Sequence, residues 1–166
     1  MVGLEELTGD VSQLRQAYGC FPSGVTAVCA QTAEGLPVGM AASSFTSVSM
    51  DPPLVSICVQ DTSTTWPVLR RMSRLGVSVL GAGQDAAARS LAARNADRFA
   101  GLDWEPTSDG GVLVRGASAW LDCTVHEEVP AGDHVIVLLR IHALAAWPDS
   151  TPLVFHGSRF RRLEVA

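Results

Sequence analysis

The chain has 166 residues, which suits one ordinary domain, so we expect residues 1–166 to form a single domain. Its 47 % hydrophobic and 17 % charged residues exclude a disordered protein, and its net charge of −5 argues against a nucleic-acid partner. All 12 basic residues are arginine, which excludes lysine Schiff-base chemistry and a P-loop lysine, so arginine, hydroxyl or backbone N–H groups must hold any anionic ligand.

The N-terminal segment is acidic and lacks the basic start and apolar run of a secretory signal, so we expect a cytoplasmic protein. The pattern of Thr8–Tyr18 then predicts an amphipathic helix, with Thr8 or Asp10 as its N-cap and Gly19 at its end. From Val25 onward the pattern becomes β-rich, with a turn at Glu34-Gly35. The expected strands are Val25–Ala30, Val38–Ser43 and Leu54–Val59.

The middle of the chain is mixed. We expect a short helix over Thr65–Met72, a strand over Gly76–Leu80 and a longer alanine-rich helix over Gln84–Phe99. A loop at Pro106–Gly111 precedes a final β-rich region. Its expected strands are Val112–Val114, Ala119–Glu127, His134–Trp147, Leu153–Phe155 and Arg159–Leu163.

Short turns join most of these strands, and there are few helices. This pattern predicts a mainly β fold with helical insertions, arranged as a closed or nearly closed antiparallel barrel. The longest apolar run, Val135–Trp147, is interrupted by Arg140 and His142 and is shorter than the roughly 20 residues that a membrane span needs. We therefore expect no membrane association.

Residues Gly81–Ala86 match the G-x-G-x-x-A dinucleotide fingerprint between a predicted strand and a predicted helix. However, residues 101–106 lack the apolar second strand that should end in a ribose-binding acid. The chain also shows no regular alternation of strands and helices. We interpret these glycines as a tight strand-to-helix turn rather than as part of a Rossmann domain.

Cysteine and histidine spacing gives little support to a metal site. Cys123-x-x-His126 has no second pair at structural-zinc spacing, and the sequence contains no H-E-x-x-H motif. We therefore expect no bound metal. We interpret His126 and His142 as structural strand residues. The cysteines are scattered, and all but Cys20 lie in apolar runs, so we expect reduced core residues. No G-x-S-x-G motif is present, so a hydrolase is not favoured.

Two hydroxyl-rich segments are candidates for ligand binding. Gly39–Pro53 carries five hydroxyl groups among small side chains, which suits either a loop that cradles a flat polar ligand or an ordinary surface loop. Thr62–Thr65 precedes a predicted helix, where free N–H groups favour a phosphate.

At several points the sequence resembles the short-chain flavin reductases, which are reductase partners of two-component flavin monooxygenases and have the split-barrel flavin-binding fold. The resemblance covers nearly the whole chain in order, and its combination of S-F-x-S-x-S-x-x-P-P with a downstream G-D-H is fairly specific. The matching segments are Phe21–Val28, Gly39–Pro53, Arg98–Gly101, Gly132–His134 and Pro152–Phe160.

This resemblance implies a role for each matching position. Flavin contacts fall on Ala42, Ser43, Ser44, Phe45, Thr46, Ser47, Ser49 and Met50. Phosphate or adenylate contacts fall on Ser63, Thr64, Thr65, Trp66 and Arg98. His134 faces the nicotinamide as the catalytic-site residue, and the C-terminal residues bordering the pocket are Phe155, Gly157, Arg159 and Phe160.

The resemblance thus implies an antiparallel split β-barrel that uses FMN or FAD with NADH or NADPH and supplies reduced flavin to a monooxygenase. Hydride transfer is the cofactor's chemistry, so the protein mainly positions its ligands. Two alternatives remain: a flavin-binding protein without reductase activity, and a flavin-dependent enzyme acting directly on a small organic substrate. We expect a homodimer, because a small barrel leaves a shallow groove and an open edge.

Overall fold

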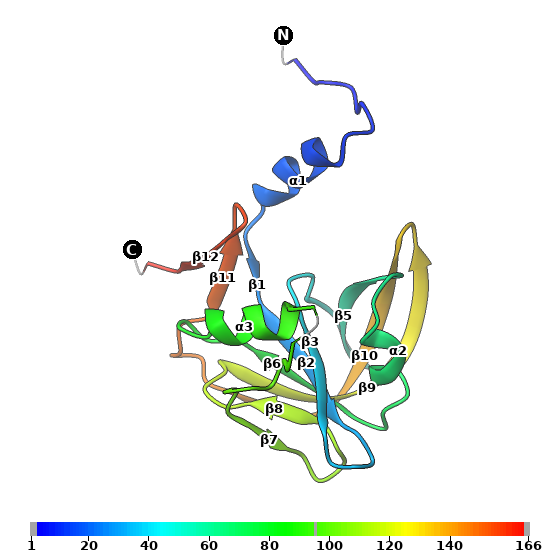
Figure 1. Cartoon of the computed structure of the whole chain (residues 1–166), viewed down its shortest axis with the longest axis vertical. Helices are drawn as coiled ribbons and strands as arrows, with labels where there is room; N and C mark the ends of the chain where they lie inside the picture. The colour runs from blue at the N-terminus through cyan, green and yellow to red at the C-terminus, as the bar shows by residue number, and fades with distance from the viewer. Residues whose placement is uncertain (1–2, 95, 165–166) are drawn as a thin grey trace.

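The computed structural model describes residues 3–94 and 96–164, and Figure 1 shows their arrangement. Strands dominate and the helices are few, as the sequence predicts. The elements are α1 (Val11–Gly19), β1 (Ser23–Gly24), β2 (Thr26–Gln31), β3 (Pro37–Ala42), β4 (Thr46–Met50), β5 (Pro53–Gln60), α2 (Trp66–Leu69), β6 (Leu75–Val79), α3 (Asp85–Ala92), β7 (Trp104–Pro106), β8 (Val112–Val114), β9 (Ala119–Ala131), β10 (His134–Ala146), β11 (Leu153–His156) and β12 (Arg159–Arg162).

The largest sheet has seven strands in the order β3-β2-β6-β9-β10-β5-β4. Two smaller sheets have the orders β1-β11-β12 and β7-β8. Each strand pairing among the described residues is antiparallel. The predicted mainly β, antiparallel class is therefore confirmed, and the decision against a Rossmann domain, which needs a parallel sheet, is confirmed with it.

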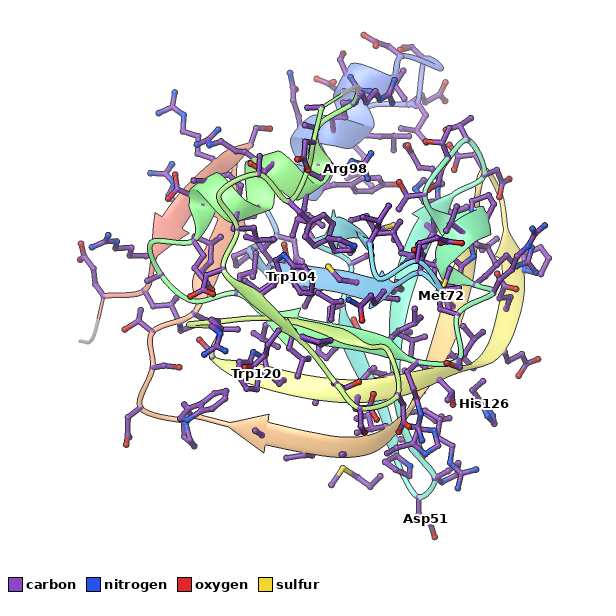
Figure 2. All side chains as sticks on the ribbon, turned by 60° about the horizontal axis from the view of Figure 1, so that its bottom comes forward. Asp51, Met72, Arg98, Trp104, Trp120 and His126 are labelled. Carbon is purple, nitrogen blue, oxygen red and sulfur yellow. The ribbon has the colours of Figure 1, made fainter. Side chains whose placement is uncertain are left out.

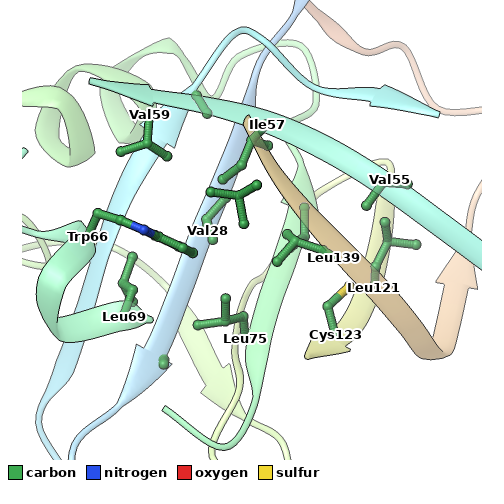
Figure 3. Packing of buried hydrophobic residues seen from close by; sticks show 14 residues of the cluster. Val28, Val55, Ile57, Val59, Trp66, Leu69, Leu75, Leu121, Cys123 and Leu139 are labelled. Atoms are coloured by element: carbon green, nitrogen blue, oxygen red, sulfur yellow. The ribbon is translucent and has the colours of Figure 1, made fainter. Parts of the chain in front are cut away.

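Strand β2 lies between two hydrophobic clusters, which explains its continuous apolar run. Val28 and Ala30 belong to a cluster inside the large sheet, together with side chains of β5, β10 and α2 (Figure 3). Ala27 and Cys29 face the opposite side, where α3 and β8 cover them. Residues on both faces of β2 are thus removed from water, so this strand anchors both layers.

The two ends of the large sheet approach one another beside Ser44. The Ser44 hydroxyl accepts a hydrogen bond from Cys58 N at 2.8 Å and donates one to Cys58 O at 3.2 Å. This side chain therefore links the exit of β3 to β5, although the two strands are not neighbours in the sheet order. The linkage creates a wall of closely spaced small residues at this end of the sheet.

Helix α1 is capped by Asp10, whose carboxylate accepts a hydrogen bond from Ser12 N at 2.8 Å. Hydrogen bonds from Ser12 also lower the pKa of Asp10. The predicted capped helix is confirmed, with Asp10 rather than Thr8 as its cap. No residue of α1 is buried, and Figure 1 shows the helix projecting away from the sheets.

The predicted helix over Gln84–Phe99 is too long. Helix α3 ends at Ala92, because Ala93 adopts extended backbone angles, φ −65° and ψ 146°. The following segment folds back, and Arg98 Nε donates to Ala93 O at 2.8 Å. Alanine-rich propensity favours continuation of the helix, but the chain turns back after Ala92, and Arg98 bonds Gly39 O and Thr65 Oγ1 on distant segments.

All four cysteines are free, as expected, but they do not all lie in the core. Cys29 and Cys123 are buried, and burial raises the pKa of each thiol to about 12. Cys58 is exposed, contrary to the prediction, because alternate residues of β5 face the core and Cys58 faces outward. His142 is a hydrogen-bonded strand residue, with Nε2 at 2.8 Å from Thr124 Oγ1.

In the part of the chain that the structure describes, no helix is long and apolar enough to cross a membrane. Among the same residues, no group of three or more histidine, cysteine or acidic side chains is arranged to hold a metal ion.

Candidate functional site

A groove of about 710 Å³ lies at the end of the large sheet where Ser44 links β3 to β5. One wall is formed by residues 40–44 and 58–60, and another by residues 62–65. The end of α3 and the segment after it, which carries Arg94 and Arg98, form a third wall. His134 lines the groove from the start of β10. This volume falls within the range of small-molecule sites in proteins.

The groove brings together residues that are far apart in the sequence. Of the residues implied by the family resemblance, eight line it: Ala42, Ser43, Ser44, Ser63, Thr64, Thr65, Arg98 and His134. Small side chains and hydroxyl groups dominate these walls, so a flat ligand can approach the backbone closely.

His134 is held in place by its neighbour Asp133. Its Nδ1 lies 2.6 Å from Asp133 Oδ1, which leaves Nε2 as the ring nitrogen available to a ligand. The hydrogen bond and the charge of His134 hold the pKa of Asp133 below its ordinary value. A backbone hydrogen bond from Asp61 N to Asp133 O, at 3.0 Å, ties this turn to the segment after β5.

Arg98 joins two walls of the groove. Its Nη1 donates to Gly39 O at 3.0 Å and to Thr65 Oγ1 at 2.7 Å, while Nε bonds Ala93 O. Figure 2 shows Arg98 beside the end of α3. The side chain is partly buried, and its three internal bonds use Nε and Nη1, while Nη2 has no protein partner among the described residues.

The segment Gly39–Pro53 is not one ligand-binding loop. It consists of the end of β3, a three-residue connection, the strand β4, which forms an edge of the large sheet, and the turn into β5. Of the predicted flavin contacts in this segment, Phe45 packs against the core cluster, and four lie outside the groove: Thr46, Ser47, Ser49 and Met50. Met50 is 94 % exposed, and its chain neighbour Asp51 lies on the other side of the molecule from Arg98 in Figure 2.

Trp66 does not line the groove either. It is buried, packs in the core and donates from Nε1 to Glu128 Oε1 at 2.7 Å, bordering a neighbouring hollow of about 590 Å³. The expected helix over Thr65–Met72 is only the four-residue α2. Ser63 Oγ accepts from Trp66 N at 3.1 Å, and Thr65 O accepts from the N–H groups of Val68 and Leu69. The expected free N–H groups are therefore largely occupied.

The four C-terminal residues predicted to border the pocket lie on β11, on β12 and in the turn between these strands. Phe155 and Phe160 pack together at 5.4 Å between ring centroids, against the second core cluster. The Arg89 guanidinium lies 4.8 Å from the Phe160 ring centroid. Gly157 N donates to Gly19 O at 3.0 Å, and Arg159 is exposed on β12. Within one chain, none of these four residues lines the groove.

Comparison with known proteins places this geometry in a family. The sequence matches the flavin reductase like domain over residues 18–164. The chain belongs to this family. The prediction based on the Gly39–Pro53 and Gly132–His134 motifs is therefore confirmed.

Three relatives illustrate the similarity. The Streptomyces globisporus C-1027 NADH:FAD oxidoreductase SgcE6, solved in complex with NAD and FAD fragments, superposes with a TM-score of 0.89 at 41 % identity, covering 96 % of this chain and 98 % of that one. BorF, the flavin reductase component of a bacterial two-component tryptophan halogenase, gives a TM-score of 0.86 at 35 % identity, covering 95 % and 100 %. The actinorhodin polyketide dimerase of Streptomyces coelicolor is 38 % identical, covering 95 % of this chain and 89 % of that protein.

Sequence reasoning missed several residues of this flavin reductase groove, notably Arg94, Cys58 and Gln60. Arg94 was assigned to the interior of a long helix, and Cys58 to the core. The absence of lysine was a usable signal, because it makes each arginine near Arg98 a candidate for anion binding. Cys58 and Gln60 alternate with the buried Ile57 and Val59, a period-2 pattern that marks the outward face of β5.

Proposed function

We propose that this protein transfers a hydride from NADH to FAD and releases the reduced flavin to a separate monooxygenase. Membership of the flavin reductase like domain family supports the reaction class. The observation that carries the proposal is the groove. It combines small residues, hydroxyl groups and His134 with two arginines, and no aspartate or glutamate is among the described residues that line it.

The groove fits a flavin nucleotide in both shape and charge. Its small side chains leave room for a flat ring, and its hydroxyl groups offer donors and acceptors to a ribityl chain. Arginine and hydroxyl groups suit the phosphate end of such a ligand. The flavin supplies a ring that accepts a hydride, so the protein needs no side chain that reacts covalently.

The residues of the chain position the two ligands and stabilise charge. Donors in the groove wall, together with its cationic lining, favour the negative charge that develops on the reduced ring. His134, whose Nδ1–H is engaged by the Asp133 carboxylate, presents Nε2 as an acceptor to the nicotinamide nucleotide, whose carboxamide N–H can donate, and so helps hold its reactive carbon against the flavin. We assign His134 a positioning role rather than one in acid catalysis.

The choice of FAD and NADH follows the NADH:FAD oxidoreductase SgcE6, which shares 41 % of its sequence with this chain. Transfer of reduced flavin to a separate enzyme follows the two-component system of BorF, and the choice of a monooxygenase follows relatives named as reductase subunits of flavin-dependent monooxygenases. Four free cysteines suit a reducing compartment, which supports the expected cytoplasmic location.

The activity is tested with the purified protein, NADH or NADPH, and riboflavin, FMN or FAD, by following the loss of reduced-nucleotide absorbance. The expected result is flavin-dependent oxidation that is fastest with NADH and FAD. If no combination exceeds the rate without protein, the reductase function is wrong.

A second candidate is a flavin-dependent enzyme that acts directly on a small organic substrate. It is favoured by the 38 % identity to a protein named actinorhodin polyketide dimerase. The two functions differ in flavin retention. A reductase that supplies flavin releases it during gel filtration, whereas an enzyme that keeps its flavin elutes yellow, with the flavin in the protein peak.

We further propose that residues 1–166 act as one split-barrel domain and assemble as a homodimer. The Ser44 link between β3 and β5 supports a nearly closed barrel. Exposed apolar side chains on β4 and β10, including Met50 and Leu144, support a second copy as the cover. Light scattering coupled to gel filtration tests this assembly; a monomer at micromolar concentration contradicts it.

A further inference from the structure

Helix α1 and its flanking residues form an arm, residues 3–21, that belongs to neither hydrophobic cluster of the described chain. No residue of α1 is buried, although Val11, Leu14 and Tyr18 share one face of the helix. An isolated helix of nine residues is only marginally stable in water, because most helical stability comes from packing of an apolar face. The arm therefore needs a surface to cover its exposed apolar side chains, Leu4, Leu7, Val11, Tyr18 and Phe21.

The arm is attached beside the three-stranded sheet. Gly157, in the turn between β11 and β12, donates from its N to Gly19 O at 3.0 Å, and Figure 1 shows α1 extending beyond this point, away from the sheets. At a rise of about 1.5 Å per residue, α1 alone spans about 13 Å. The match to the flavin reductase like domain begins at residue 18, so most of the arm precedes that domain.

The three-stranded sheet has one covered face and one open face. Phe155 and Phe160 pack against the second core cluster on the covered side, and Val154 belongs to neither cluster of the described residues. In the register of β11 and β12, Val154 lies opposite Arg161, and His156 lies opposite Arg159. Since successive residues of a strand point to opposite sides, these four residues share the open face, which we call the outer face: Val154, His156, Arg159 and Arg161.

The arm and the outer face carry opposite charges. The protein has a net charge of −5, yet β12 holds three of its 12 arginines within four residues. Throughout the part of the chain that the structure describes, none of these three arginines forms an ion pair. The arm has one basic residue, Arg15, and three acidic ones, Glu5, Glu6 and Asp10. Carboxylates pair with guanidinium groups, and the exposed rings of Tyr18 and Phe21 suit contact with arginine side chains.

The same charges argue against a lipid surface as the partner of the arm. Helices that lie on anionic membranes carry lysine and arginine on their polar face. The polar face of α1 carries Ser12, Gln13 and Gln16, and the residues before the helix are acidic. The arm thus fits a protein surface that is basic and partly apolar, and the outer face of this chain has that composition.

We propose that the arm of one chain packs on the outer face of the three-stranded sheet of a second copy, which returns the same contact. A two-fold axis makes such a contact reciprocal. Because each arm is attached at the β11–β12 turn of its own chain, a two-fold axis near this turn brings each arm to the outer face of the other chain. The proposal rests on the homodimer proposed above and adds to it a contact outside β4 and β10.

The experiment uses two full-length variants. The arm variant is Glu5→Arg with Glu6→Arg, and the face variant is Arg159→Glu with Arg161→Glu. Each variant alone places like charges on the two surfaces, so we expect its dimer dissociation constant to rise about tenfold or more at low salt. In an equimolar mixture, the basic arm meets the acidic outer face and the other contact is that of the wild type. The dissociation constant of the mixture should return to within about threefold of the wild-type value. Sedimentation velocity over a dilution series measures each constant.

The mixture separates exchange between chains from contact within one chain. An arm that binds its own sheet carries the charge mismatch into the mixture, so mixing then restores nothing. The matched controls are Arg71→Glu and Asp149→Arg, which reverse charges at exposed positions outside both surfaces and should change the dissociation constant less than about twofold. Circular dichroism checks that each variant is folded. Tyr18→Ser, at an exposed position and without a change of charge, should weaken the dimer about fivefold and provides a second measurement.

The proposal is overturned if the arm and face variants dimerise as tightly as the wild type, if their mixture is no tighter than either alone, or if Tyr18→Ser has no effect. Binding of the wild type to phosphatidylglycerol vesicles that Tyr18→Ser abolishes would assign the arm to a lipid surface instead. A wild type that stays monomeric throughout the dilution series rejects the homodimer itself, whereas a stable dimer that is unaffected by the variants rejects only the exchange of arms.

Discussion

The two hydroxyl-rich segments, Ser43–Ser49 and Thr62–Thr65, look alike in the sequence but have different places in the structure. All four residues of Thr62–Thr65 line the groove. In the other segment only Ser43 and Ser44 do so, and the hydroxyl groups of Thr46, Ser47 and Ser49 lie on the edge strand β4. Composition identifies both as polar segments, but strand register decides which hydroxyl groups reach a ligand.

The hydroxyl groups that reach the groove also differ in what they do. Those of Ser44 and Thr65 already have protein partners, Cys58 and Arg98. We therefore expect Ser44 and Thr65 to contribute to the shape of the groove. The Ser63 hydroxyl likewise accepts from Trp66 N, so Ser43, Thr62 and Thr64 are the hydroxyl residues left for direct ligand contact. The following predictions test this division.

The largest expected contrast is between thiols. Cys29 and Cys123 are buried with pKa values raised to about 12, so their thiolate fraction near neutral pH is lowered roughly a thousandfold relative to an ordinary thiol. The exposed Cys20 and Cys58 should react with iodoacetamide in the native protein, while the buried pair should not. Peptide mass mapping measures each site. Saturating FAD should protect Cys58, which lines the groove, and leave Cys20 reactive; equal reactivity of Cys58 with and without FAD contradicts the placement of flavin there.

Next in size is Ser44→Ala, which removes both hydrogen bonds to Cys58 and leaves two backbone groups of β5 without that partner. We expect a loss of about 2 kcal/mol in the free energy of unfolding and a weaker affinity for FAD. The control is Ser47→Ala on β4, whose side chain is exposed and outside the groove, with an expected change below about 0.5 kcal/mol. Urea titration measures both. Equal effects would show that the link across the sheet is unimportant.

A smaller effect is expected for Thr65→Val, which keeps the side-chain shape but removes an acceptor of Arg98. Because the pair is partly accessible to water, we expect a loss of about 1 kcal/mol and a lower melting temperature. Thr62→Val is matched in chemistry and should leave the melting temperature unchanged, since Thr62 is exposed and makes no contact with Arg98. A similar loss in both variants would argue against the Arg98 contact as the cause.

The smallest effect concerns Asp133, whose side chain is 91 % exposed. The hydrogen bond from His134 lowers the pKa of Asp133, so its carboxylate is ionised at neutral pH. Its hold on the His134 ring is lost only as the pH falls through this lowered pKa, which lies below the ordinary aspartate value of about 4. Asp133→Asn should raise the KM for NADH about twofold to fivefold at pH 7 by releasing the ring of His134. His134→Ala should raise it further. If His134→Ala leaves this KM unchanged, the assigned role of His134 is wrong.

The sequence predicted the strand-rich antiparallel fold because β2, β5 and β6 carry strong local signals, namely apolar runs between glycine and proline residues. It failed where tertiary contacts decide. Nothing local in Arg98 shows that its side chain will bond Ala93 O and end the helix, nor that β4 will pair along β5 with a bulge near Ser47.

The candidate site was predicted in part for a related reason. Motif resemblance located His134 and the Thr65 region, since these residues stand next to recognisable strand ends. It gave no information on which side chains already have protein partners, so it did not show that Arg98 also bonds Gly39 O and Thr65 Oγ1.

The Ser44 link also makes one amide a reporter of ligand binding. Cys58 N–H bonds a side-chain oxygen instead of a strand carbonyl, so its protection from hydrogen exchange depends on a single rotatable group at the rim of the groove. A molecule that immobilises that rim should slow exchange at this position, whereas the amides of β2, enclosed on both sides, should exchange at the same rate with or without it.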